Sequence, residues 1–330
     1  MKTGSVTKPA PTAVSPENGV TPTWHVLGAG AMGCLWASAL ADTQAVCLVL
    51  KDSRTRDNYP GFVRQIDGRG RTVDVPIPAE VPATLDTGSV QRLLLCCKAQ
   101  DAQMAIASVQ HALSADSVIV LLQNGCEFQQ TLTAARPPGT VFCLSTSAGA
   151  WLREPFVVIP AGHGQSWLGH LDTRAPKQSD ERALALLAEL PATRMTIRFE
   201  PRMSHRLWQK LAVNCAINAL TVVHDCRNGE LLTRPEAFAQ LKALCHEISG
   251  LYDQLPETPD LPDLFETVSA VARGTADNIS STLQDVRRGK TTEIEHLNGF
   301  LVRLAMRHRQ PCPLNIALLD AVRQRESGPQ

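Results

Sequence analysis

The hydrophobic pattern of the first half of the chain predicts strands that alternate with helices. Short, almost entirely apolar runs occur at 24–27, 45–50, 92–97 and 117–122. Continuous rather than alternating apolar positions are typical of parallel strands that are buried on both faces. A helix is predicted at 34–41, between the first two runs. Weaker strand patterns are predicted to complete and extend the sheet at 140–144, 156–159 and 196–199.

The pattern becomes helical after residue 203. Apolar positions at helical spacing predict helices at 204–224, 235–254, 262–287 and 292–308, with a shorter one near 315–325. Thr292 and Glu295 fit a capping box for the fourth helix, which would place Glu293 in its first turn. Asn278 and Ser281 are three residues apart and are predicted to share a face of the third helix.

These patterns predict two domains that follow a short tail. Residues 1–23 are rich in Pro, Thr, Ser and Ala and lack the apolar region of a secretory signal, so we expect a disordered tail. We expect an α/β domain over 24–199 and an all-helical domain over 200–330.

One predicted helix carries polar groups on an otherwise apolar surface. Between residues 211 and 220 the polar residues are Asn214 and Asn218, and Lys210 precedes them by four and eight positions. Residues at this spacing lie along one face of a helix. Burying an ammonium and two amides costs several kcal/mol unless other groups pair with them. The stripe is therefore either an internal structural network or the wall of a binding site.

A glycine motif joins the first strand to the first helix. Gly28, Gly30 and Gly33 follow the pattern G-x-G-x-x-G. The first glycine permits a tight turn, the second lets the backbone approach a pyrophosphate, and the third lets the helix pack closely against the strand. The helix N-terminus would then face the phosphates. Because a strand and a helix flank the motif, a dinucleotide site is favoured over a glycine-rich turn without a ligand.

The end of the second strand indicates which dinucleotide is bound. NAD sites usually place an acid there for the ribose hydroxyls, whereas NADP sites place a cation for the 2′-phosphate. Lys51 comes first and Arg54 and Arg56 follow closely, which favours NADPH. Asp52 keeps NADH as the alternative.

Two further polar residues follow predicted strands. Lys98 and Asn124 come after the third and fourth apolar runs. Ligands of parallel α/β sheets bind beyond the carboxyl ends of the strands, so both side chains are candidates for a site. The alternative interpretation is that both residues lie at ordinary, solvent-exposed strand ends and bind no ligand.

Composition argues against several classes of function. Lys plus Arg and Asp plus Glu number 32 each, so no basic field favours nucleic acid or a membrane surface. No segment reaches the roughly 18 apolar residues of a membrane span. The 10 cysteines are scattered without a C-x-x-C pair, which indicates reduced core thiols in a cytoplasmic protein. The histidines show no metal-ligand spacing with cysteines or acids, so we expect no metal.

Together, these motifs resemble the ketopantoate reductases (2-dehydropantoate 2-reductases) over about residues 24–325. The motifs are GAGAMG at 28–33, KAQ at 98–100, QNG at 123–125, WQKLAVNCAIN at 208–218, NGEL at 228–231, NISSTLQD at 278–285 and TEIEHLNG at 292–299. The resemblance implies an α/β Rossmann-like NADP-binding domain and an all-α domain like the C-terminal domain of 6-phosphogluconate dehydrogenase. It also implies NADPH-dependent reduction of 2-dehydropantoate to (R)-pantoate, for pantothenate and coenzyme A biosynthesis, by a monomer or homodimer.

The resemblance further implies a role for each matched residue. Lys210 is expected to be the catalytic acid, with Glu293 beside the reaction centre. The implied substrate-binding residues are Asn124, Asn214, Asn218, Asn228, Asn278 and Ser281. The implied cofactor-binding residues are Gly28, Ala29, Gly30, Ala31, Met32, Gly33, Lys51, Lys98, Asn124, Ala150 and Glu293.

The chemistry of keto-acid reduction is compatible with these roles. Hydride addition to a ketone leaves negative charge on its oxygen, and an ammonium can stabilise that charge and then supply a proton. Burial is expected to lower the pKa of Lys210, and Glu293 is expected to raise it again.

Two positions depart from the family pattern. Ala219 stands where the family usually has proline, and Gln123 stands where it often has histidine. Neither is a proposed catalytic group, but both bear on substrate preference. The alternatives are therefore an NADPH-dependent enzyme that reduces another 2-keto acid or makes an N-linked opine-type product, and a non-catalytic NADPH-binding sensor.

Overall fold

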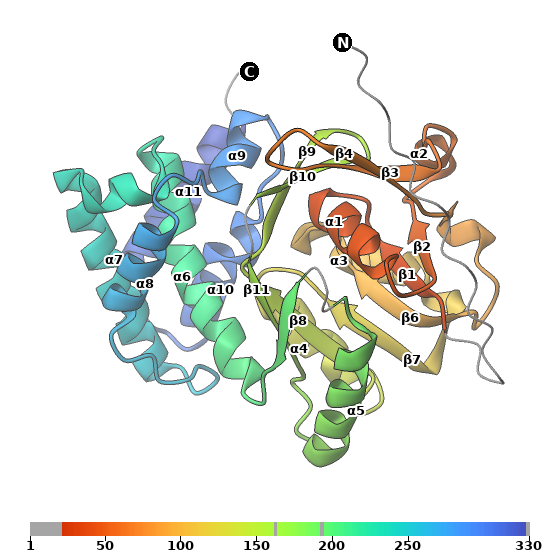
Figure 1. Cartoon of the computed structure of the whole chain (residues 1–330). Coiled ribbons are helices and arrows are strands. Elements are labelled where there is room, and N and C mark those ends of the chain that lie inside the picture. The colour runs from red at the N-terminus through yellow and green to blue at the C-terminus, as the bar shows by residue number, and fades with distance from the viewer. Residues whose placement is uncertain (1–21, 162–163, 192–194, 328–330) are drawn as a thin grey trace, which may run out of the picture.

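The computed structural model describes residues 22–161, 164–191 and 195–327. An α/β half and a helical half lie side by side (Figure 1). The tail predicted at 1–23 lies outside the described residues except for its last two positions.

A mostly parallel sheet forms the centre of the α/β half. Its order is β12-β11-β8-β7-β6-β1-β2-β5 within the described residues. The strands are β1 (Trp24–Leu27), β2 (Val46–Val49), β5 (Ala79–Glu80), β6 (Val90–Leu95), β7 (Leu113–Leu121), β8 (Val141–Thr146), β11 (Gln165–Gly169) and β12 (Thr196–Phe199). Their pairings are parallel except that between β8 and β11. The four continuous apolar runs form β1, β2, β6 and β7, which pair in parallel, so the parallel sheet predicted from these runs is confirmed.

Strand order brings the carboxyl ends of the central strands to one edge. β1 lies between β2 and β6, and β7 and β8 follow on the β6 side. The helices of this half are α1 (Ala31–Leu40), α2 (Ser53–Asp57), α3 (Ala99–Ser108), α4 (Glu127–Ala135) and α5 (Pro176–Glu189). The chain runs from β1 to β2 in one direction along the sheet and from β6 to β7 in the other, and ligands of α/β sheets bind in the crevice where the strand order reverses.

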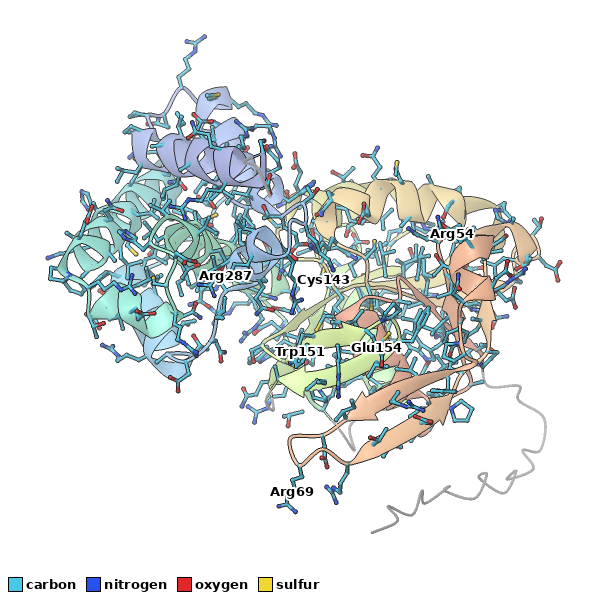
Figure 2. The ribbon with its side chains drawn as sticks, turned by 90° about the horizontal axis from the view of Figure 1, so that it is seen from above. Arg54, Arg69, Cys143, Trp151, Glu154 and Arg287 are labelled. Atoms are coloured by element: carbon cyan, nitrogen blue, oxygen red, sulfur yellow. The ribbon has the colours of Figure 1, made fainter. Side chains whose placement is uncertain are left out.

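A second sheet, with the order β4-β3-β10-β9, covers α1 (Figure 1). Its strands are β3 (Phe62–Ile66), β4 (Thr72–Pro76), β9 (Gly149–Glu154) and β10 (Val157–Ala161). The prediction that the strand at 156–159 extends the main sheet is therefore wrong. Val158 points into the core shared with α1, while Trp151 and Glu154 lie on the adjacent strand β9 (Figure 2).

The helical half is arranged around α6. Its helices are α6 (Met203–Val223), α7 (Pro235–Gln254), α8 (Leu264–Gly274), α9 (Ser281–Arg287), α10 (Asn298–Arg307) and α11 (Pro313–Ser327). α6 contacts α7, α8, α9 and α11. Its core also includes Cys126 and Cys143 of the α/β half, and Cys143 lies where the two halves meet (Figure 2). No helix in the described ranges is long and apolar enough to cross a membrane.

The prediction of one helix at 262–287 is wrong. α8 ends at Gly274, and α9 begins at Ser281 after the N-cap residue Ser280, whose Oγ accepts from the Leu283 N–H at 3.1 Å. Asn278 lies in the connection between them, so it does not share a helix face with Ser281. The backbone leaves the helix here because the Asn278 carbonyl accepts a hydrogen bond from the Asn228 N–H at 3.0 Å.

The predicted capping box at 292–295 is also wrong. Thr292 Oγ1 accepts from the Ile294 N–H at 3.1 Å, and the Glu295 carboxylate pairs with Arg323 at 2.6 Å instead of reaching back. A 3₁₀ turn, η4 (Ile294–His296), precedes α10. Glu293 is the residue before that turn and not part of the first turn of an α-helix.

The cysteines are free thiols, as predicted. All are buried except Cys96 and Cys97, which are half-buried. Burial raises the pKa of Cys34 to about 12 and that of Cys47 to about 11, so these thiols stay protonated at neutral pH.

Candidate functional site

The glycine turn between β1 and α1 has the geometry of a phosphate cradle. Gly28 has a φ of 105°, and a Cβ added there would lie 2.7 Å from the Cys97 backbone nitrogen. A Cβ on Gly33 would lie 1.8 Å from the Gly28 carbonyl oxygen. A Cβ on Gly30 would meet nothing within 4 Å. Gly28 and Gly33 are therefore required by packing, whereas Gly30 faces open space at the helix N-terminus, which fits a pyrophosphate.

The end of β2 presents cations toward solvent. The Lys51 side chain is 81% exposed. Asp52 caps α2, because its Oδ1 accepts from both the N–H and the Oγ1 of Thr55 at 2.7 Å, and these bonds lower its pKa. Arg54 belongs to the same helix and lies on the side of the α/β half away from the helical half (Figure 2). Lys51 Nζ also lies 3.9 Å from Asp52 Oδ2. An acid that is engaged by a helix cap and by a neighbouring lysine supports a 2′-phosphate more than a pair of ribose hydroxyls.

Two other predicted residues lie at the same edge of the sheet. Lys98 is the N-cap residue of α3, just after β6, and Asn124 follows β7. Gln123 joins these segments because its Nε2 donates to the Leu95 and Cys97 carbonyls at 2.9 and 3.1 Å. The residue that departs from the family pattern at this position thus holds the two loops together.

Glu293 connects the two halves of the protein at this edge. Its Oε1 accepts from the Ala99 N–H and its Oε2 from Asn124 Nδ2, both at 2.9 Å. One carboxylate from the helical half therefore contacts both the β6–α3 and the β7–α4 connections, which brings the predicted site residues Glu293 and Asn124 together.

Lys98 forms a second connection between the halves. Its Nζ lies 2.8 Å from Asp285 Oδ2 and donates to the Thr291 carbonyl at 3.1 Å. The Asp285 side chain is 16% exposed, and burial raises its pKa. Asp285 is not among the predicted site residues, although its position one helical turn after Ser281 is visible in the sequence.

Lys210 reaches from α6 to the carboxyl end of β8. Its Nζ donates to the Thr146 carbonyl at 3.0 Å. Burial lowers its pKa to about 8; Glu293 raises the pKa and Arg206 lowers it further. The expected effects of burial and of Glu293 on this pKa are confirmed, whereas the effect of Arg206 and the hydrogen bond to the Thr146 carbonyl were not predicted. A backbone carbonyl leaves no signal in a sequence.

Asn214 and Asn218 continue the stripe along α6. Asn218 is 7% exposed and Asn214 is half-buried. Neither side chain forms a hydrogen bond within the described residues. Neither amide is among the fully buried polar groups that lack a hydrogen-bond partner. Their amides are therefore not parts of an internal network, which leaves the wall of a binding site as the better interpretation. The helix continues without a break through Ala219.

The remaining predicted residues lie elsewhere around the helical half and the second sheet. Asn228 is buried, and its Nδ2 donates to Thr275 Oγ1 at 2.9 Å. Asn278 and Ser281 are exposed. Within the described residues, no hydrogen bond links these three to Lys210 or Glu293. Ala150 lies on β9, which packs against α1.

Arg206 lies one helical turn before Lys210 on α6. Its Nε contacts Glu200 Oε2 at 3.0 Å, and its guanidinium carbon lies 3.6 Å from the centre of the Trp167 ring. These contacts hold a second cation near Lys210. The i, i+4 spacing between the two basic residues is visible in the sequence, but their surroundings are not.

Comparison with known proteins identifies the family. Residues 24–173 match the family described as ketopantoate reductase PanE/ApbA, and residues 202–326 match its C-terminal part. The 2-dehydropantoate 2-reductase of Escherichia coli O157:H7 is 31% identical over 303 residues, which cover 92% of this chain and 94% of the relative. The chain belongs to the ketopantoate reductase family.

Other members and solved structures agree with this family and fold. The 2-dehydropantoate 2-reductase of Yersinia pestis is also 31% identical, over 308 residues, with 92% of this chain and 94% of the relative covered. The crystal structure of a PanE/ApbA family ketopantoate reductase from Ralstonia eutropha JMP134 has a TM-score of 0.80 at 25% identity, covering 92% and 98% of the two chains. A D-mandelate dehydrogenase with NADH and anilino(oxo)acetate has a TM-score of 0.82 at 19% identity over 92% and 98%. The predicted Rossmann-like domain followed by an all-α domain is confirmed.

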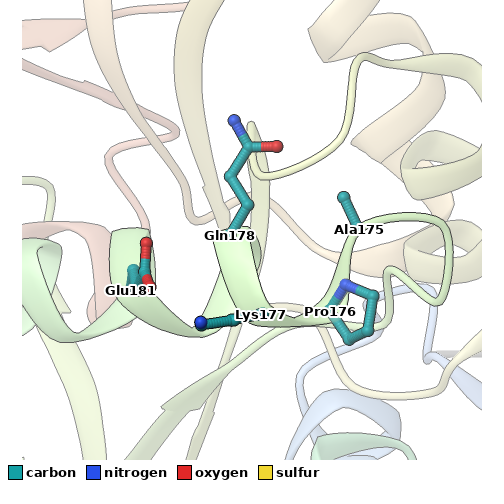
Figure 3. Close-up of a pocket in the computed structure, with 5 residues that line it drawn as sticks. All are labelled: Ala175, Pro176, Lys177, Gln178 and Glu181. Atoms are coloured by element: carbon teal, nitrogen blue, oxygen red, sulfur yellow. The ribbon is translucent and has the colours of Figure 1, made fainter.

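A hollow at the N-terminus of α5 lies outside this site. It has a volume of about 470 Å³ and is lined by Ala175, Pro176, Lys177, Gln178 and Glu181 (Figure 3). None of the predicted site residues lines it, and its side chains belong to a solvent-exposed helix start.

Proposed function

We propose that the protein reduces 2-dehydropantoate to pantoate with NADPH. The observation that carries the proposal is the position of Lys210, a half-buried lysine whose ammonium contacts the carboxyl end of β8 and has a pKa lowered to about 8. Glu293 and Asn124 lie at the same edge of the sheet, which also bears the glycine turn. We further propose that the protein is cytoplasmic and acts on a small keto acid as a monomer or homodimer. Neither nucleic acid nor a membrane is a proposed partner.

The residues of the α/β half fit a bound dinucleotide. Gly30 and the N-terminus of α1 would receive the pyrophosphate, since nothing in the structure fills the space beside Gly30. Lys51 would receive the 2′-phosphate, and Lys98 would lie near the ribose and nicotinamide. When bound, NADPH supplies the hydride for the ketone carbon.

Lys210 would act on the ketone oxygen. Charge that develops there is stabilised by the ammonium, which then donates its proton. One N–H of the ammonium already donates to the Thr146 carbonyl, which orients the group and leaves others for the substrate. Because its pKa is about 8, Lys210 is still protonated at neutral pH, yet it is a stronger acid than an ordinary lysine.

The amides of α6 would hold the substrate. In the part of the chain that the structure describes, the side-chain amides of Asn214 and Asn218 form no hydrogen bond, and they lie on the face of α6 that also bears Lys210. They can therefore bind a carboxylate and a hydroxyl, the groups that flank the ketone of 2-dehydropantoate. Glu293 would contact the substrate hydroxyl and keep Lys210 protonated. Ser281, on α9, would contribute from the opposite wall.

Substitution of Lys210 tests the proposed acid. Lys210→Ala should lower kcat by roughly 10²–10⁴-fold, the usual contribution of a general acid, while NADPH affinity stays within about twofold. Lys242→Ala, which removes an exposed lysine from α7 of the same half, is the matched control and should leave kcat unchanged. Near-normal turnover by Lys210→Ala would remove this residue from the mechanism.

A substrate panel tests the reaction itself. NADPH oxidation is followed with 2-dehydropantoate, 2-ketoisovalerate and pyruvate, and the panel is repeated with NADH. The highest kcat/KM is expected for 2-dehydropantoate with NADPH. A clear preference for another keto acid would assign a different substrate to the same site. NADPH binding without turnover of any keto acid would indicate a sensor.

A further inference from the structure

Asn298 is a fully buried amide that contacts the middle of α6. It is the first residue of α10 and has 0% exposure. Its Nδ2 donates to the Cys215 carbonyl at 3.1 Å and to Asn315 Oδ1 at 2.9 Å. Cys215 directly follows Asn214 and precedes Asn218 by three residues, so this side chain holds the backbone of the turn that carries both amides of the substrate wall.

The partners of Asn298 fix its orientation. Asn315 also has 0% exposure, and its Nδ2 and backbone N–H both donate to Glu247 Oε1 at 2.8 Å. Glu247 Oε2 accepts from the Leu314 N–H at 2.7 Å. Because the amide nitrogen of Asn315 faces a carboxylate, its oxygen must face Asn298, and Asn298 must donate there. The chain of bonds runs from α7 through α11 and α10 to α6.

The bond to Cys215 is additional to the bonding of the helix itself. In an unbroken α-helix the Cys215 carbonyl accepts from the Ala219 N–H, four residues on. Asn298 is thus a second donor to a carbonyl that already has one. The Asn298 Oδ1 has no hydrogen-bond partner within the described residues. A buried oxygen without a hydrogen-bond partner lowers the stability of the fold. An apolar residue at this position would avoid that loss, so packing alone does not explain the asparagine.

We propose that Asn298 is a positioning residue, which fixes the rotation and axial position of α6 so that Asn214 and Asn218 face the substrate. This inference rests on the proposed function, because it takes the two amides as the substrate wall. Lys210 lies one turn earlier on the same helix and is held independently by the Thr146 carbonyl. The effect of Asn298 therefore falls on binding of the keto acid more than on proton donation.

The experiment compares Asn298→Ala with a matched core variant. Asn298→Ala should raise KM for 2-dehydropantoate about tenfold, the loss expected for one buried hydrogen-bond arrangement, with the dissociation constant of NADPH unchanged. Ser269→Ala, which removes a buried and unpartnered hydroxyl from α8 of the same core, should leave both values unchanged. A purely structural role predicts instead a lower melting temperature, with a normal KM for 2-dehydropantoate when it is measured well below that temperature. That result would overturn the inference.

Glu247→Gln provides a milder second variant, should Asn298→Ala fail to fold. Glu247 is half-buried at the far end of the network, and the amide cannot accept all three hydrogen bonds of the carboxylate. KM for 2-dehydropantoate should rise about threefold, again with NADPH binding intact. Normal KM in Glu247→Gln and in every folded Asn298 variant contradicts the inference. A wild-type protein that turns over no keto acid contradicts the proposed function instead.

Discussion

Lys98 and Asp285 form an ion pair of 2.8 Å that joins the two halves of the protein. Lys98 follows strand β6 of the main sheet, and Asp285 lies on α9, one turn after Ser281. The ammonium therefore stands between a residue proposed to hold the cofactor and a helix proposed to face the substrate. Because the Asp285 carboxylate is mostly buried, the pair is protected from the screening that weakens exposed ion pairs.

Asp285→Asn should weaken NADPH binding. The amide keeps the size of the carboxylate but loses its charge, so Lys98 is held less firmly beside the proposed ribose position. Hydrogen bonds to charged groups contribute about 1.5–3 kcal/mol, and KM for NADPH should rise roughly tenfold or more. Steady-state kinetics with NADPH as the varied substrate make the measurement.

Asp225→Asn is the control for this prediction. Asp225 also pairs with a cation of α9, because Arg287 lies 2.7 Å from its Oδ1, but this pair is exposed and does not include Lys98. KM for NADPH should be unchanged in this variant. Equal effects of the two substitutions would mean that general loosening of α9, and not the position of Lys98, is responsible.

Gly30 and Gly33 should respond differently to substitution by alanine. Gly33→Ala places a Cβ 1.8 Å from the Gly28 carbonyl oxygen, a backbone clash that no side-chain movement relieves, so the protein should be strongly destabilised. Gly30→Ala adds a Cβ in open space and should fold normally. It should still raise the dissociation constant of NADPH by about tenfold or more, because the methyl group occupies the approach of the pyrophosphate. Thermal melting and fluorescence titration separate the two effects; tight NADPH binding by folded Gly30→Ala would argue against the cradle.

The sheet and its ligand-binding edge could be predicted because their signals are local. Continuous apolar runs mark buried parallel strands, and the polar residues that follow them, such as Lys98 and Asn124, meet at one edge by topology alone. Lys210, Asn214 and Asn218 were visible for a similar reason, since helical spacing places them on one face. In each case a pattern within about ten residues determines the structural outcome.

The errors and omissions come from contacts that are distant in the chain. The predicted helix is interrupted at Asn278, whose carbonyl accepts a hydrogen bond from the N–H of Asn228, fifty residues earlier. The Glu295 carboxylate pairs with Arg323 instead of capping its own helix. The second sheet exists because strands separated by many residues pair above α1. Composition and periodicity carry no information about such pairings, so tertiary contacts overruled the local patterns.

Ser280 and Ser281 are neighbours with different expected roles. Ser280 Oγ caps α9 and also lies 2.6 Å from Thr221 Oγ1, so Ser280→Ala should lower the free energy of unfolding by about 1–2 kcal/mol. Ser281 is exposed, and Ser281→Ala should change stability by less than about 0.5 kcal/mol while raising KM for 2-dehydropantoate. Urea unfolding and steady-state kinetics distinguish the two. A stability loss in Ser281→Ala without any change in KM would remove this residue from the proposed substrate wall.

Arg206 and Glu293 should move the pH dependence of the reaction in opposite directions. Lys210 acts as an acid only while protonated, and its pKa is about 8, so kcat/KM should fall as the pH rises through that value. Arg206 disfavours a second positive charge nearby and thereby lowers this pKa, whereas the Glu293 carboxylate favours the charge and raises it.

Removing either charge therefore has a definite sign. Arg206→Gln should raise the pKa of Lys210 and shift the alkaline limb of kcat/KM to higher pH. Glu293→Gln should shift that limb to lower pH, in addition to any loss of substrate contact. pH profiles of the wild type and the two variants, recorded at constant ionic strength, measure both shifts. Movement of the limb in the same direction in both variants, or a limb that neither variant moves, would show that a group other than Lys210 controls the alkaline side of the profile.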